Sequence, residues 1–177
     1  MKRTLIFLFA CLFILNAGAK DKTPVPGVCG IAIGVTRGTL LETIRKSSLF
    51  TDAECTVDTN AVMINSQKKG MLLCDSLKVA SIKCLFNKRP TLQGLSVIFP
   101  AANVTDLENI VTALNTMLGN PKSASSDKVG FRYEAEWKDS PYEASFFASD
   151  QAFEAYLLLG YSSFVKEEED RSMKFGK

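Results

Sequence analysis

The sequence contains no histidine, and this absence excludes more chemistry than any other feature of the composition. Ser-His-Asp triads, cysteine-histidine pairs and HExxH metalloprotease motifs all need an imidazole group. The glycine-rich phosphate-binding motifs GxxxxGK[ST] and GxGxxG are missing as well. We therefore predict no catalytic residue of these classes, no metal site and no bound cofactor.

The chain also lacks an excess of positive charge. Of its 21 basic residues, Lys2 and Arg3 belong to an N-terminal segment that we expect to be removed, which leaves 19 basic against 19 acidic residues. A nucleic-acid-binding protein usually concentrates basic residues on one face. We expect no nucleic-acid partner.

Residues 1–19 have the features of a secretory signal peptide. Two basic residues precede an apolar run over 5–15, and three small residues follow at 17–19. The apolar run is shorter than the roughly 20 residues that a membrane-spanning helix needs. The sequence therefore predicts cleavage after residue 19, a periplasmic or secreted protein, and no stable membrane anchor after cleavage.

Cleavage would leave four cysteines, namely Cys29, Cys55, Cys74 and Cys84. An even number of cysteines in an oxidising compartment indicates two disulfides. A zinc site is one alternative, but no pair has CxxC spacing and no histidine could complete the ligand set. Free buried thiols are the other alternative. Four cysteines allow three connectivities, and the sequence does not choose between them.

The remaining chain has the length of a single domain. Residues 20–28 are polar and contain prolines, and we expect a flexible leader there. Residues 29–165 are predicted to form one α+β domain. Residues 166–177 are charged and show no periodicity, which favours a disordered tail.

The segment 104–118 carries the strongest helix signal. Apolar residues recur at spacings of three and four, Thr105 and Glu108 form a possible capping box, and Gly119 and Pro121 end the pattern. A shift of 66 positions places residues 39–44, TLLETI, on residues 105–110, TDLENI, with four identities. The same shift places 31–33 on 97–99. This internal similarity predicts two similar halves, about 29–91 and 92–165.

Each predicted helix is followed by segments typical of strands. In the second half, residues 131–138 alternate between apolar and charged side chains, and Trp137 falls on the apolar side. The predicted fold class is α+β, with a strand-helix-meander unit in tandem and two helices packed on antiparallel β-sheet. A short buried strand is predicted over 30–34. The other predicted strands are 54–64, 71–74, 77–86, 92–99, 131–138, 142–148 and 153–161, and 122–128 is predicted to be a polar loop.

Two features carry a resemblance to known families. Gly34-Val35-Thr36 opens the first predicted helix, and Val104-Thr105 opens a second that ends in Leu118-Gly119-Asn120-Pro121, with Tyr133 and Trp137 on the next strand. This pattern resembles the tandem repeats of secreted β-lactamase inhibitor proteins and of small outer-membrane assembly lipoproteins. The resemblance implies a binding protein with a protein partner in the cell envelope. The chain departs from the lipoproteins because it lacks their lipid-attachment cysteine.

Carboxylates are the remaining candidates for catalysis. Glu134 and Glu136 share one face of a predicted strand, and Glu143 on the returning strand could approach them. Paired carboxylates catalyse glycoside hydrolysis. The alternative is that Glu134 and Glu136 form, with Arg132 and Lys138, the solvated and charge-paired side of an amphipathic strand.

Aromatic residues are the candidates for binding. Phe147 should lie on the opposite face from Tyr142 and Phe146, beside Glu134 and Glu136, and Tyr156 or Tyr161 could join it. The alternative is a return strand that is buried on both faces.

The candidate binding residues are Glu134, Glu136, Phe147 and Tyr156. The sequence thus predicts an exported protein-binding or inhibitor-like module, whose partner is another envelope or secreted protein. A small carboxylate-dependent hydrolase and a structural envelope component are the alternatives.

Overall fold

A computed structural model describes residues 26–51, 53–66, 72–74, 77–127, 132–149 and 154–175. Within these ranges, the side chains of residues 72–74, 149 and 172–175 are not described. The predicted signal peptide and most of the predicted leader lie outside the described residues. None of the helices in the described part of the chain is long and apolar enough to cross a membrane.

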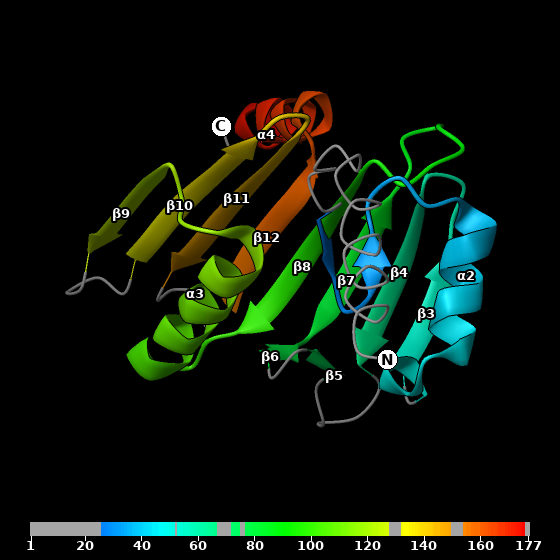
Figure 1. Cartoon of the computed structure of the whole chain (residues 1–177), viewed down its shortest axis with the longest axis horizontal. Helices are drawn as coiled ribbons and strands as arrows, with labels where there is room; N and C mark the ends of the chain where they lie inside the picture. Colours follow the sequence, from blue (N-terminus) through cyan, green and yellow to red (C-terminus); the bar gives the residue numbers. More distant parts are fainter. Residues whose placement is uncertain are drawn as a thin grey trace, which may run out of the picture.

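The described residues form a mixed α and β fold built on one eight-stranded antiparallel sheet (Figure 1). The order across this sheet is β3-β4-β7-β8-β12-β11-β10-β9, and two small hairpins, β1-β2 and β5-β6, form separate two-stranded sheets. The strands are β1 (Gly27–Val28), β2 (Ile31–Ala32), β3 (Ala53–Val57), β4 (Ala61–Ser66), β5 (Leu72–Cys74), β6 (Leu77–Val79), β7 (Ser81–Leu85), β8 (Gly94–Pro100), β9 (Ser123–Asp127), β10 (Arg132–Asp139), β11 (Tyr142–Ser149) and β12 (Glu154–Tyr161).

Three α-helices and one 3-10 helix accompany the described strands. They are α2 (Arg37–Lys46), η1 (Ser48–Phe50), α3 (Val104–Leu118) and α4 (Ser162–Phe175). Figure 1 shows α2 and α3 toward opposite edges of the large sheet. The Thr36 side chain caps α2 by accepting a hydrogen bond from the Thr39 backbone N–H at 3.2 Å.

Helix α3 has the predicted bounds but not the predicted cap. The N-cap is Asn103, whose side-chain oxygen accepts a hydrogen bond from the Asp106 backbone N–H at 2.9 Å. The proposed Thr105–Glu108 capping box is therefore wrong, because Thr105 already lies inside the helix. Gly119 ends the helix with φ 79°, a conformation that a side chain would strain.

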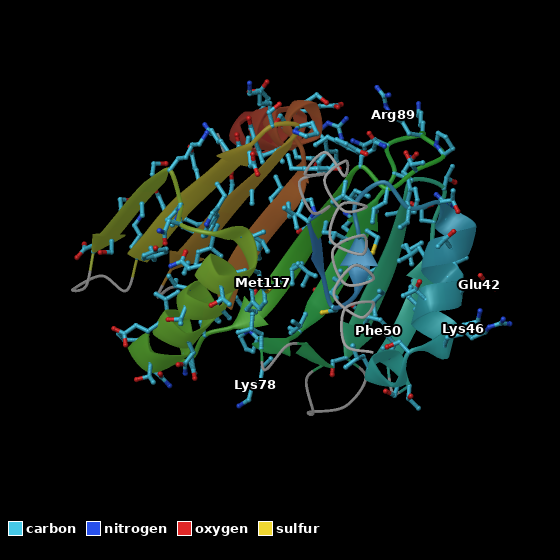
Figure 2. The ribbon with its side chains drawn as sticks, in the orientation of Figure 1. Glu42, Lys46, Phe50, Lys78, Arg89 and Met117 are labelled. Carbon is cyan, nitrogen blue, oxygen red and sulfur yellow. The ribbon has the colours of Figure 1, made fainter. Side chains whose placement is uncertain are left out.

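The two faces of the large sheet have different surroundings. The face that carries Val62, Val97 and Leu157 shares one buried cluster with Leu40 of α2 and Leu107 of α3. We call it the core face. The opposite face, which we call the open face, carries the alternate residues of the same strands. Figure 2 shows that the other side of α2 points outward, where Glu42 and Lys46 form an ion pair at 3.5 Å.

Helix α4 covers one end of the open face, so the predicted disordered tail is wrong over 166–175, and residues 176–177 lie outside the described residues. Its residues Phe164 and Val165 are buried against Ala61 and Leu85. The Phe164 ring lies directly on Gly94 of β8, because a Cβ built there would be 2.1 Å from its Cε1 atom. Sequence reasoning missed this helix because only its first turn is apolar, and the charged turns that follow resemble a solvated tail.

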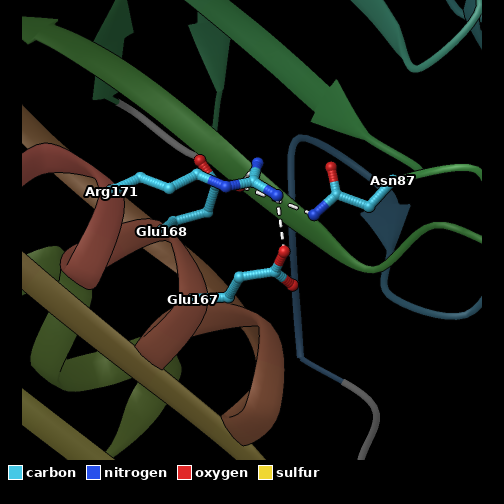
Figure 3. A network of polar contacts seen from close by, with 4 residues as sticks. All are labelled: Asn87, Glu167, Glu168 and Arg171. Carbon is cyan, nitrogen blue, oxygen red and sulfur yellow. Dashed lines mark hydrogen bonds and ion pairs between the residues drawn. The ribbon is translucent and has the colours of Figure 1, made fainter.

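Charged side chains also attach α4 to the turn after β7 (Figure 3). The Arg171 guanidinium donates hydrogen bonds to Glu167 at 2.5 Å and to Glu168 at 2.8 Å. The Asn87 amide donates to the same Glu168 carboxylate at 3.5 Å. Exposed ion pairs of this kind contribute little individually, so the buried residues of the first turn hold the helix on the sheet.

Other predictions about strands are partly correct. Strands β8, β10, β11 and β12 match the predicted segments closely, and the last three form the predicted meander. The predicted strand 54–64 is instead two strands, and the predicted loop 122–128 contains β9, which pairs with β10. The predicted buried strand near residue 31 is only the hairpin strand β2, and its partner β1 lies in the predicted flexible leader.

Candidate functional site

Strand β10 separates polar from apolar side chains as its alternation predicted. Ala135 and Trp137 are buried on the core face, whereas Glu134 and Glu136 lie on the open face. The indole Nε1–H of Trp137 donates a hydrogen bond to the Gly119 carbonyl oxygen at 2.8 Å. This bond satisfies the polar group of a buried aromatic side chain, and the assignment of Trp137 to the core is confirmed.

The strand register brings the four candidate binding residues together. Phe147 of β11 pairs with Glu134 of β10 on one side and with Tyr156 of β12 on the other. Since directly paired residues of antiparallel strands lie on the same face, all three side chains share the open face with Glu136. They line a shallow depression of about 280 Å³, together with Ser145, Leu158 and Glu169.

The aromatic residues of this cluster are solvent-accessible. Phe147 is 40% exposed and Tyr156 is 36% exposed, whereas Phe146, on the core face, is 2% exposed. The alternative of a return strand buried on both faces is therefore wrong. Tyr161 does not join the cluster, because it stacks on Tyr142 on the core face with ring centroids 5.2 Å apart.

The two glutamates of β10 are both paired with cations. Arg132 Nη2 lies 2.8 Å from Glu134, and Lys138 Nζ lies 3.0 Å from Glu136. The hydrogen bond from Lys138 holds the pKa of the Glu136 carboxyl below its usual range. A general acid in glycoside hydrolysis needs the opposite shift. The geometry thus matches the charge-paired, solvated strand that was the alternative to a catalytic role.

Polar contacts also fix the surroundings of the aromatic pair. The Tyr156 hydroxyl donates a hydrogen bond to Glu154 at 2.5 Å, and this bond raises the pKa of Tyr156. The Arg132 guanidinium lies 5.8 Å from the centroid of the Phe147 ring, within the range of a cation–π interaction.

Sequence reasoning missed several residues of this site. Glu154 and Leu158 lie two positions before and after Tyr156, so the period of a strand could have placed them on the same face. Ser145 could have been found from Phe147 in the same way. Glu169 gave no such signal, because it belongs to α4; it accepts a hydrogen bond from the Ser145 hydroxyl at 2.5 Å.

The cysteines depart from the predicted pair of disulfides. Cys55 of β3 and Cys84 of β7 are free thiols. Strand β4 lies between β3 and β7, so the two backbones are about 9 to 10 Å apart, too far for a disulfide. Burial raises the pKa of the Cys84 thiol to about 12. Cys29 is buried and disulfide-bonded.

Two larger hollows contain none of the candidate binding residues. One of about 390 Å³ lies between α3 and β10, next to Leu107 and Tyr133, and one of about 350 Å³ lies beside Trp137 and Met117. Across the described residues, no group of three or more cysteine, aspartate or glutamate side chains is placed to hold a metal ion.

The fold and the candidate site together define a protein with one wide antiparallel sheet and a partly uncovered, aromatic open face. Comparison of the chain with protein-family models, with curated proteins and with solved structures gives no match.

Proposed function

We propose that the protein is exported and acts without catalysis, by binding another envelope or secreted protein through the open face of its sheet. The observation that carries this proposal is the cross-strand pair of Phe147 and Tyr156, both more than one-third exposed. Aromatic side chains supply much of the binding energy of protein interfaces. A solvent-accessible aromatic pair whose neighbouring carboxylates, Glu134 and Glu136, are paired with cations suits recognition better than a reaction.

We also propose that the domain consists of two similar halves, with the boundary after β8 instead of near residue 91, where the internal similarity had placed it. Each half is then a helix followed by four strands of the large sheet. In support, α2 precedes β3, β4, β7 and β8, and α3 precedes β9 to β12. The last strands of the two sets, β8 and β12, pair with each other at the centre of the sheet. This arrangement makes one continuous sheet, and the part of its open face that α4 leaves uncovered is available to a partner.

The carboxylate-dependent hydrolase is the weaker candidate. Lys138 holds the Glu136 carboxyl in its ionised form, and Glu134 is paired with Arg132 on an open surface. A structural envelope component would use the same open face with a permanent partner. The dissociation rate of the complex distinguishes that role from inhibition.

Affinity capture tests the proposal. The exported form, residues 20–177, serves as bait for the envelope and secreted fractions of the source organism, beside a Phe147→Ala/Tyr156→Ala variant. Val104→Ala is the matched control, since Val104 is an exposed apolar residue of α3, 47% exposed. Loss of two interface anchors should weaken binding at least tenfold.

A protein retained by the wild type and the control, but not by the double variant, would support the proposal. A partner that binds all three baits equally would place recognition elsewhere on the molecule. If reproducible captures retain no partner, the binding function itself is refuted.

A further inference from the structure

The open face carries an excess of negative charge around its aromatic pair. Five carboxylates and two cations lie on β10, β11, β12 and the adjacent side of α4. Four of the carboxylates and both cations are placed on this face by the strand register, and Glu169 is placed there by its hydrogen bond to Ser145. The carboxylates are Glu134, Glu136, Glu143, Glu154 and Glu169, and the cations are Arg132 and Lys138.

The carboxylates surround the apolar centre instead of clustering at one point. Glu134 lies directly across from Phe147 on β10, and Glu154 precedes Tyr156 by two residues on β12. The Tyr156 hydroxyl holds the Glu154 carboxylate beside the ring. Neighbouring strands are about 4.8 Å apart, so one extended segment of a partner could contact the aromatic pair and both carboxylates at once.

The charge also bears on which occupant fits. A second copy of the chain, placed face to face on this surface, would bring two net negative surfaces together, because a two-fold interface uses the same patch on both subunits. Like charges placed opposite each other across an interface disfavour association. The far part of the open face does not change this balance, since Glu54 of β3 is offset by Lys83 of β7.

On the basis of the proposed function, we infer that the open face recognises a protein segment that carries an apolar or aromatic residue flanked by lysine or arginine. The apolar residue contacts Phe147 and Tyr156. The flanking cations lie near Glu134 and Glu154, with their aliphatic stems along the aromatic rings. Charge complementarity of this kind sets specificity and speeds association.

Selection from a library of random dodecapeptides displayed on phage tests the inference and does not require the partner to be identified. Peptides are selected on the exported form and counter-selected on the Phe147→Ala/Tyr156→Ala variant. We expect the surviving peptides to share an apolar residue with lysine or arginine within three positions on either side. Selected peptides that are neutral or acidic would overturn the charge inference and leave the proposed function standing. If no peptide depends on the aromatic pair, the proposed function and the inference both fail.

Charge variants then test the assignment residue by residue, with one synthetic peptide from the selection as the probe. Glu134→Gln/Glu154→Gln should weaken its binding about four- to twenty-fivefold, because each exposed ion pair is worth roughly two- to fivefold. Glu42→Gln/Glu108→Gln, on α2 and α3, removes the same charge elsewhere and should change binding less than twofold. Raising the salt from 0.1 M to 1 M should also weaken binding, since the screening length falls from about 10 Å to about 3 Å. Equal effects of the two double variants, or binding that does not depend on salt, would refute local charge recognition. Sedimentation equilibrium provides a further test, because dimerisation through the open face would also refute it.

Discussion

The contact between Phe164 and Gly94 predicts that one added methyl group will release helix α4. A Cβ atom at Gly94 would lie 2.1 Å from Cε1 and 2.4 Å from Cδ1 of the Phe164 ring. Carbon atoms in contact are about 3.5 to 4 Å apart, so the ring would have to move by more than 1 Å. Gly160, which pairs with Gly94 across β12 and β8, leaves no room on the other side, because its own Cβ position is 2.7 Å from the ring.

The expected loss of folding free energy in Gly94→Ala can be worked out for two cases, in which the Phe164 ring either stays in place or leaves the sheet. If the ring stays, overpacking costs about 1 to 3 kcal/mol. If the ring leaves, the lost burial of a phenylalanine costs about 1.5 to 3 kcal/mol. Either way we expect the free energy of unfolding to fall by about 2 kcal/mol, and the melting temperature by roughly 4 to 8 °C for a domain of this size.

Denaturant unfolding and limited trypsin digestion measure the two parts of this prediction. In the variant, trypsin should cut faster at Lys166 and Arg171 of α4 than at sites elsewhere in the chain. Gly38→Ala is the control, since Gly38 is exposed near the start of α2 and a Cβ there meets only the Thr36 hydroxyl at 4.0 Å. Alanine is the better helix former, so this change should be neutral or slightly stabilising.

A double-mutant cycle decides whether the ring contact is the cause. Phe164→Ala alone should cost about 3 to 5 kcal/mol. In that background, Gly94→Ala should have little further effect, because its Cβ no longer meets a ring. If Gly94→Ala costs the same with and without the Phe164 ring, or leaves α4 fully protected from trypsin, the reasoning is wrong.

Three further predictions follow from other contacts. Iodoacetamide at pH 8 should label Cys55 in the native protein, but Cys84 only after unfolding. The reason is that, at a pKa of about 12, roughly one Cys84 thiol in 10,000 is ionised at this pH. Labelling of both cysteines in the native protein, read by mass spectrometry, would contradict the burial of Cys84 in β7. Trp137→Phe should lower the free energy of unfolding by about 1 to 3 kcal/mol, because the Gly119 carbonyl oxygen loses its donor; an unchanged denaturation midpoint would argue against this bond. The lowered pKa of Glu136 stabilises the fold above the usual glutamate pKa of about 4.3, and this contribution is lost as the pH falls through the lower folded-state value. The stability difference between wild type and Glu136→Gln should therefore shrink on acidification, and a difference that grows below pH 4 would reverse the assigned direction.

The candidate site could be predicted in part because strands have a period of two. That period alone placed Phe147 beside Glu134 and away from Phe146, and the register confirms the placement. The strand period does not reveal whether another element covers the face that Phe147 shares with Glu134. It therefore could not decide whether Phe147 is exposed or buried. Only the position of α4, at one end of the open face, leaves the aromatic pair accessible.

The sequence by itself determined the elements whose signals are local. The bounds of α3 follow from its apolar spacing and from Gly119, and the faces of β10 follow from its alternation. Tertiary structure decided whatever depends on residues far apart in the chain. Strand β9 is polar and exists because β10 pairs with it, and α4 docks because two glycines on neighbouring strands leave space for Phe164. The order β3-β4-β7 keeps Cys55 and Cys84 apart. Such contacts form only when the whole sheet is assembled, so a local sequence pattern does not reveal them.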